Sequence, residues 1–236
     1  MNFQIIFYIL TFIALIPSRI NAQNANKVRI IGEMREVMWK GELSGKIDLD
    51  TISNKTNLYG LGPVEYLAGE ILIINGKSYR SVVTGENSMK VEETYQIKAP
   101  FFGYANVSQW KEQSLPDSIR TIQQLEDYIN ALTTKSTRPF FFRLQGTIEN
   151  ATIHIVNLPA GSTVSSPDEA HVGQVNYDLS NEQAEIIGFF STRHKAIFTH
   201  HDTFLHMHLI TIDHKKMGHL DKLLLGRGVK LFLPLE

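Results

Sequence analysis

The chain of 236 residues is long enough to bury a sizeable core as one large domain or two small ones. Its formal net charge of -1 gives no electrostatic reason to expect a nucleic acid or an anionic membrane surface as a partner. The sequence has no cysteine, which excludes disulfides, thiolate nucleophiles and iron–sulfur clusters. A metal site would therefore use His, Asp and Glu, a ligand set that suits zinc or a similar divalent ion.

The first residues are typical of a signal peptide. The run from Ile5 to Pro17 is apolar except for Thr11, it is shorter than a membrane span needs, and Ala22 suits a cleavage site. No Lys or Arg precedes the run, which leaves an uncleaved anchor as the alternative. We predict that residues 1–22 are removed, that the protein is exported to the periplasm or the medium, and that the mature form is not bound to a membrane.

The next part of the chain predicts strands and a hairpin. Residues 27–41 mix β-branched and aromatic side chains and fit a strand or a short helix. A block with three glycines, residues 58–70, leads into an apolar strand over 71–74, and Asn75-Gly76 is a strong signal for a two-residue hairpin turn. Glu70 begins this strand, and a carboxylate there is either a solvent-facing strand end or a functional group.

The middle of the chain predicts a strand over 101–110 and an amphipathic helix over 118–133. Asp117 or Ser118 would be the N-cap of that helix. Its apolar positions recur at helical spacing and indicate packing: Ile119, Ile122, Leu125, Ile129 and Leu132.

A further strand, over residues 140–156, carries an arginine among phenylalanines. Alternation puts Phe141, Arg143 and Gln145 on one face and Phe140, Phe142 and Leu144 on the other. A guanidinium in such surroundings usually has an anionic partner, which favours a role for Arg143 in a site. The alternative is an arginine that stacks on the aromatic rings.

Seven of the nine histidines lie between His194 and His219. Residues 204–210 alternate as a strand does, so His206 and His208 should share one face, opposite Leu205, Met207 and Leu209. Two adjacent imidazoles and a third ligand after a turn, here His219, are a common way to hold a divalent metal. The alternative is a histidine-rich surface strand.

Three pieces in this order resemble the α-acetolactate decarboxylase family. They are Tyr59-Gly60-Leu61-Gly62 through Gly69-Glu70 to Tyr79, the strand Phe142-Arg143-Leu144-Gln145-Gly146, and His206-x-His208 with Gly218-His219-Leu220. The resemblance implies a mixed α/β (α+β) fold. A β-sheet domain with the amphipathic helix would span residues 23–135, and a smaller barrel-like β-domain carrying the histidines would span 136–236.

The same resemblance implies the chemistry. Zinc would be bound by His206, His208 and His219, while Glu70 and Arg143 match the active-site glutamate and arginine of the family. The reaction would be the decarboxylation of 2-acetolactate to acetoin and CO2. A metal that chelates the carbonyl and hydroxyl oxygens stabilises the developing enediolate as a Lewis acid, so no organic cofactor is needed. Arg143 would pair with the carboxylate or the enediolate and Glu70 would supply the proton. The family suggests a homodimer.

The sequence departs from the family pattern at several places. Pro63 stands where the family usually has threonine, Ala68 replaces a common aspartate, and the sequence ends at Glu236, before the tail that carries a second active-site glutamate in the family. Glu236 is a possible substitute by position. Two alternatives therefore stay open: a decarboxylase of another small β-keto or 2-hydroxy-3-oxo acid, and a non-catalytic metal- or ligand-binding protein. No role is assigned to the remaining histidines, which are expected at the surface or around the metal ligands: His154, His171, His194, His200, His201 and His214.

Overall fold

The computed structural model describes residues 26–200 and 202–235. The predicted signal peptide, residues 1–22, lies outside the described residues. Within those ranges, no helix is long and apolar enough to cross a membrane.

The first half of the chain forms an antiparallel six-stranded sheet in the order β1-β8-β3-β4-β5-β6. The hairpin prediction is confirmed, because Asn75 and Gly76 have φ angles of 48° and 81° and join β4 to β5. The range 27–41 holds both a strand and a helix. The bounds are β1 Arg29–Ile31, α1 Met34–Lys40, β2 Ile47–Asp48, β3 Leu58–Pro63, β4 Glu70–Ile74, β5 Lys77–Gly85, β6 Ser88–Glu93, β7 Lys98–Ala99 and β8 Phe102–Asn106, and β2 pairs with β7.

The second half forms another six-stranded sheet, in the order β11-β12-β13-β10-β14-β9. Strand β10 also pairs with β11 over almost its whole length, so that β10, β11, β12 and β13 close into a ring. This ring supports the barrel-like expectation in part. The bounds are β9 Trp110–Ser114, α2 Ile122–Leu132, β10 Phe140–Ile155, α3 Pro167–Ala170, β11 Val175–Phe190, β12 Leu205–Thr211, β13 Met217–Leu225 and β14 Lys230–Pro234.

Helix α2 exists as predicted but starts later. The prediction of Asp117 or Ser118 as its N-cap is wrong, since the N-cap is Thr121. The Thr121 side chain accepts a hydrogen bond from the backbone N–H of Gln124, and the Gln124 side chain accepts one from the backbone N–H of Thr121, which makes a capping box. This reciprocal pair satisfies two N–H groups. Asp117 instead lies inside a turn that is closed by a hydrogen bond from the N–H of Ile119 to the carbonyl oxygen of Pro116.

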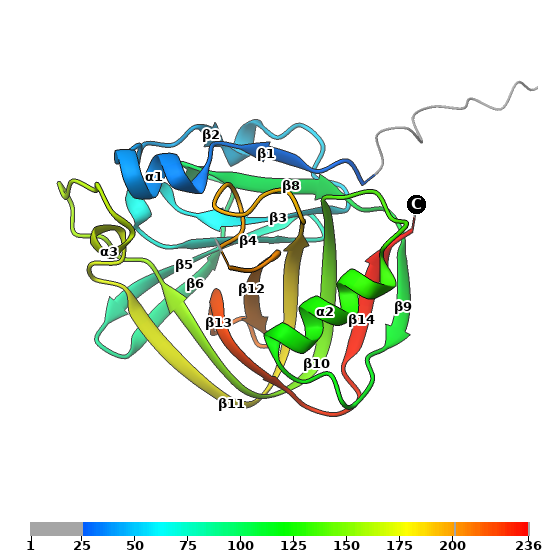
Figure 1. Cartoon of the computed structure of the whole chain (residues 1–236). Coiled ribbons are helices and arrows are strands. Elements are labelled where there is room, and N and C mark those ends of the chain that lie inside the picture. The colour runs from blue at the N-terminus through cyan, green and yellow to red at the C-terminus, as the bar shows by residue number, and fades with distance from the viewer. Residues whose placement is uncertain (1–25, 201, 236) are drawn as a thin grey trace, which may run out of the picture.

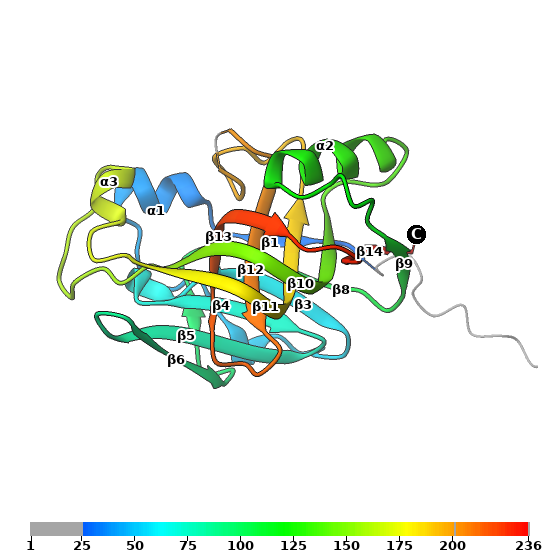
Figure 2. The same cartoon turned by 90° about the horizontal axis from the view of Figure 1, so that it is seen from below.

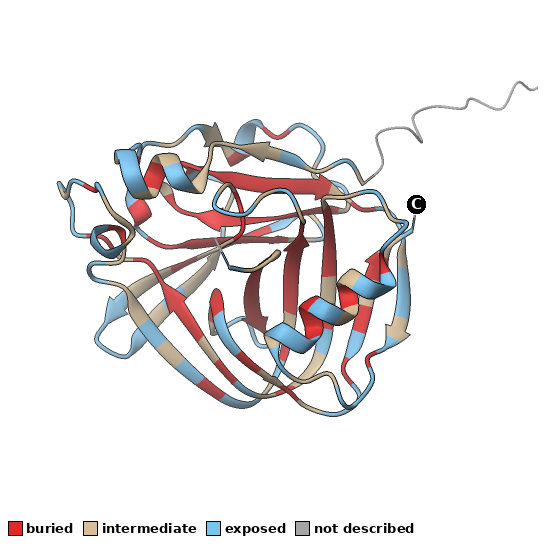
Figure 3. Cartoon of the chain, in the orientation of Figure 1, coloured by how far each residue is buried: buried red, intermediate tan, exposed pale blue. Residues whose placement is uncertain are grey.

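The two sheets pack face to face, with α2 across the second sheet and α1 beside α3 at one end (Figures 1 and 2). Side chains from both sheets form one core, for example Leu61 and Leu72 against Phe141 and Phe189. Buried residues concentrate along the strands between the layers (Figure 3). Strand β9 pairs with β14, so residues from before and after position 135 share a sheet. The division into domains at residue 135 stays a prediction.

Candidate metal centre and active site

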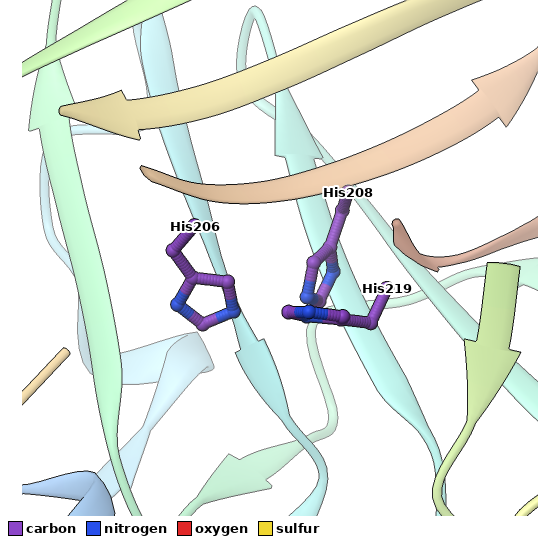
Figure 4. A group of neighbouring side chains, drawn as sticks. All are labelled: His206, His208 and His219. Carbon is purple, nitrogen blue, oxygen red and sulfur yellow. The ribbon is translucent and has the colours of Figure 1, made fainter. Parts of the chain in front are cut away.

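Three histidines converge between the two sheets. Strand β12 places His206 and His208 on the face opposite Leu205, Met207 and Leu209, which belong to the core of the ring, as alternation predicts. His219 on β13 is the direct cross-strand neighbour of His208. One nitrogen from each of the three imidazoles lies within 4.8 Å of the others, and the rings face a common point (Figure 4).

The surroundings of these imidazoles suit a metal ion. The Nδ1 of His206 lies 2.7 Å from the carbonyl oxygen of Phe198, which orients the ring and leaves Nε2 free to bind. Neither ring nitrogen of His208 makes a hydrogen bond of ordinary geometry with the described residues, although the side chain is fully buried. The backbone of Ile71 is near enough only to oppose part of the fall in the pKa of His208. A buried imidazole without a partner is unfavourable, and a metal ion at this position would satisfy it.

Burial also keeps the three rings neutral. Burial is the largest cause of the shift in each ring. It lowers the pKa of His208 to about 3, and it holds the pKa values of His206 and His219 well below the ordinary value of a histidine. A neutral imidazole has the lone pair that a metal needs. The donor set, nitrogen without sulfur, fits zinc or a similar divalent ion.

These pKa shifts predict how the stability of the metal-free protein depends on pH. The folded-state pKa of each of the three histidines lies below 6.5. Their contribution to the free energy of unfolding is therefore complete above pH 6.5 and is lost as the pH falls. For His208 this loss continues down to about pH 3. Each contributes a slope of up to about 1.4 kcal/mol per pH unit in that window. Glu70, whose folded-state pKa is raised, acts in the opposite direction. We expect the free energy of unfolding, measured with urea, to fall between pH 6.5 and 5. A flat profile would contradict the neutral cluster.

Glu70 lies beside the histidines at the start of β4. Its side chain accepts a hydrogen bond from the backbone N–H of Val156 at 3.3 Å, and Oε2 lies 3.6 Å from Nε2 of His208. The preceding Gly69 has φ 147°, and a Cβ there would lie 2.4 Å from the carbonyl oxygen of Ser81, so only glycine permits this entry into the strand. The alternative of a solvent-facing carboxylate is wrong, since Glu70 is 3% exposed.

The environment of Glu70 favours its protonated form. Burial raises the pKa of this carboxyl well above its ordinary value, the negative charge of Asp221 raises it further, and the Val156 hydrogen bond opposes the shift. A carboxyl group of this kind can hold a proton near neutral pH and release it to a substrate.

The structure places Arg143 elsewhere. Its Nε donates a hydrogen bond to Glu185 at 2.7 Å, and the guanidinium lies 4.9–5.8 Å from the ring centroids of Tyr59, Trp110 and Phe232. The predicted anionic partner and the aromatic stacking are therefore both present. Arg143 is not one of the described residues that line the cavity beside the histidines. Its catalytic role stays a prediction.

The ion pair between Arg143 and Glu185 predicts a loss of stability in variants. Because both side chains are largely buried, removing one partner leaves the other uncompensated, so Arg143→Met should destabilise the fold by about 3 kcal/mol. Glu185→Gln should also destabilise it. Thermal unfolding measures both losses. The predicted catalytic role further requires that Arg143→Met lower the decarboxylation rate more than Glu185→Gln does.

Two further histidines join the site. The Nδ1 of His154 on β10 lies 2.7 Å from Oδ2 of Asp221, and its ring lies 4.7 Å from that of His219. The Nε2 of His200, in the segment between β11 and β12, lies 3.2 Å from Nε2 of His219. The expectation that such histidines surround the metal ligands fits both positions.

A cavity of about 370 Å³ opens onto this cluster. One end is polar, with Glu70 and the histidines, and the remainder is mostly apolar. Pro63, at the position where the family usually has threonine, is part of its wall. The cavity is lined by Met34, Arg35, Met38, Trp39, Pro63, Leu67, Glu70, Phe101, His154, Val156, Pro167, His171, Ala196, His200, His206 and His219.

The model of the alpha-acetolactate decarboxylase family matches residues 33–231. The chain belongs to this family. Members of this family are carboxy-lyases, so the protein is an enzyme of that class. The structure brings four of the predicted site residues together: His206, His208, His219 and Glu70.

Solved structures show the same fold. Acetolactate decarboxylase from Bacillus subtilis subspecies spizizenii is 19% identical with a TM-score of 0.73, over 88% of this chain and 85% of that one. Alpha-acetolactate decarboxylase from Bacillus subtilis strain 168 is 17% identical with a TM-score of 0.70, covering 89% and 86%. A Staphylococcus aureus protein of unknown function, similar to alpha-acetolactate decarboxylase, is 16% identical with the same TM-score and coverage. No curated protein matches the sequence.

Proposed function

We propose that this member of the decarboxylase family converts 2-acetolactate to acetoin and CO2 with the help of a divalent metal, zinc by preference. His206, His208 and His219 would hold the ion, and Glu70 would be the acid. The observation that carries the proposal is the cluster of three buried, neutral imidazoles next to a buried carboxyl group of raised pKa, at the polar end of one cavity.

The residues divide the reaction between them. When bound, the metal would act as a Lewis acid toward the oxygen atoms of the substrate. The bond between C2 and the carboxylate breaks, its electron pair moves toward the adjacent ketone, and C2 then needs one proton to give acetoin. Glu70 would donate that proton, and the burial that raises its pKa supports this role. The apolar wall of the cavity would limit the access of water to the same carbon.

One experiment tests the proposal. The purified protein is assayed for bound metal by mass spectrometry and for acetoin after addition of racemic 2-acetolactate. We expect about one metal ion per chain, zinc by preference, and acetoin that disappears on treatment with a chelator and returns with added zinc. If the protein binds metal but releases neither acetoin nor CO2 from any 2-hydroxy-3-oxo acid, the proposal fails and a non-catalytic binding protein is the remaining alternative.

We also propose that the protein is exported after removal of residues 1–22, which rests on the apolar run of the sequence alone. The mass of the protein recovered from the producing cells and from the medium checks this. The homodimer suggested by the family is likewise a proposal, and size-exclusion chromatography with light scattering decides it.

A further inference from the structure

The cavity beside the histidines exceeds what acetolactate needs. A five-carbon acid would place its carboxylate, hydroxyl and ketone at the polar end, against His206, His219 and Glu70. The cavity of about 370 Å³ continues well beyond that end. Volumes of roughly 300–1,000 Å³ are typical of pockets for drug-sized ligands. The remaining space can therefore hold a further part of a ligand, beyond the polar groups that bind at the histidines.

The wall of this extra space is apolar. Helix α1 contributes Met34, Met38 and Trp39, and Leu67 and Phe101 lie with them around the cavity. Methionine is flexible and adapts to apolar ligands of different shape. Trp39 lines the cavity but is 60% exposed. A ligand that covers this large aromatic surface would gain free energy from its burial.

The apolar wall is built into the fold. Val37 anchors α1 by its full burial in the core between the sheets, and the N–H of Met34 donates a hydrogen bond to the carbonyl of Ile197 at 2.7 Å. Met34 and Met38 are four residues apart and so lie on one side of the helix. Among the described residues that line the cavity, Arg35 is the one with a permanent charge. Its Nε lies 2.5 Å from Oε2 of Glu33, in an ion pair at the exposed side of α1.

We propose that the preferred substrate is a 2-hydroxy-3-oxo acid with an apolar substituent of about four or more carbons, which lies against α1. This inference rests on the proposed function and names the substrate class of the same site. The polar atoms of the substrate stay at the histidines, and CO2 leaves C2, which takes up one proton. The product is therefore an α-hydroxy ketone with the long chain intact. Only the substituent distinguishes this reaction from the conversion of acetolactate.

Kinetics with a substrate series test the inference. The purified, zinc-loaded protein is given 2-hydroxy-3-oxo acids that carry methyl, propyl or pentyl at C2, and CO2 release is followed. Burial of each added methylene should raise kcat/KM about threefold to fourfold. The pentyl substrate should thus exceed acetolactate by at least about tenfold, even with partial burial. A value of kcat/KM that falls with chain length would overturn the inference while leaving the proposed function intact.

Variants of α1 locate the chain-binding surface. Trp39→Ala should reduce the ratio of kcat/KM for the pentyl over the methyl substrate, because it removes apolar surface from the wall, and Met38→Trp should reduce it by filling the cavity. Leu132→Ala is the matched control, since Leu132 is a similarly exposed apolar residue on the other long helix and lies outside the lining of the cavity. An equal ratio in all these variants and the parent would contradict a role of α1.

A binding measurement tests the inference without turnover. The sequence has two tryptophans, and Trp110 packs against Tyr59 away from the cavity. Both residues emit, but only Trp39 lines the cavity, so a change in emission on ligand binding reports on Trp39. We expect 2-hydroxyoctanoate, which lacks the ketone and cannot decarboxylate by this route, to shift the emission and to bind at least tenfold more tightly than lactate. Trp39→Ala should abolish the shift. If no acid is decarboxylated but 2-hydroxyoctanoate binds in this way, the proposed function fails and the binding preference stands; equal binding of the two acids overturns the inference.

Discussion

Replacing His208 with leucine is expected to abolish metal binding and, without metal, to leave the fold at least as stable as before. His208 is fully buried, and neither of its ring nitrogens makes a hydrogen bond of ordinary geometry with the described part of the chain. Loss of one of three ligands should weaken metal affinity more than 100-fold, because changes to outer partners alone weaken it by about 10–100-fold. Removing an unpartnered polar group from the core should stabilise the metal-free fold by about 1–2 kcal/mol.

Metal analysis and urea unfolding of the metal-free proteins measure the two effects. The matched control is His214→Asn on the hairpin between β12 and β13, an exposed histidine with φ 55°, a conformation that asparagine tolerates. It should keep the metal and the activity. Retention of metal by His208→Leu, at one ion per chain, would contradict the three-histidine centre.

Replacing Glu70 with glutamine is expected to lower the decarboxylation rate by about 10²- to 10⁴-fold and to leave the metal in place. The amide oxygen can still accept the hydrogen bond from Val156, so the position of the side chain is preserved, but the amide has no acidic proton to transfer. The loss should appear in kcat more than in KM, because proton donation acts after binding. Steady-state kinetics, together with metal analysis of the same sample, separate the two effects.

Glu126→Gln is the control for a buried carboxyl group. Glu126 is 7% exposed, accepts a hydrogen bond from the N–H of Phe204 at 2.7 Å and does not line the described cavity. An amide oxygen can accept the same bond, and we expect turnover close to that of the parent. A rate for Glu70→Gln equal to that of this control would remove Glu70 from the reaction.

The sequence predicts the metal ligands because they follow local rules. His206 and His208 lie on one strand, two residues apart, so alternation alone puts them on one face. His219 lies on the next strand and directly opposite His208. The apolar strand, the hairpin at Asn75-Gly76 and the amphipathic helix are equally local patterns, and the structure has all three.

Features that depend on long-range geometry escape such reasoning. His154 was not assigned to the site, and simple alternation from Phe142 would place it in the core of the ring. The register of β10 against β13 shifts after Ile148 and again after Thr152, and Ile153 belongs to that core instead, so His154 reaches the other face. Only the bulged pairing of the two strands shows this.

Arg143 illustrates a second limit. The sequence indicates an anionic partner for its side chain, but it cannot distinguish a protein carboxylate from a substrate. In the fold, Glu185 lies on β11 opposite Gln145, one strand away, and supplies that partner from within the protein. The sequence also does not predict that α1 forms part of the cavity wall. Met34, Met38 and Trp39 are typical packing residues, and only the fold brings them beside Leu67 and Phe101.

The three histidines that would bind the metal lie close together in the sequence, and this bears on when during folding the ion could bind. All three histidines belong to the single hairpin of β12 and β13, whereas Glu70 is more than a hundred residues earlier in the chain. Contacts within a hairpin form in microseconds, far sooner than pairings between distant segments. If the proposed metal centre forms, this short segment could capture the ion during folding, before the two sheets meet. Its binding would then fix the strand register around which the remaining layers assemble.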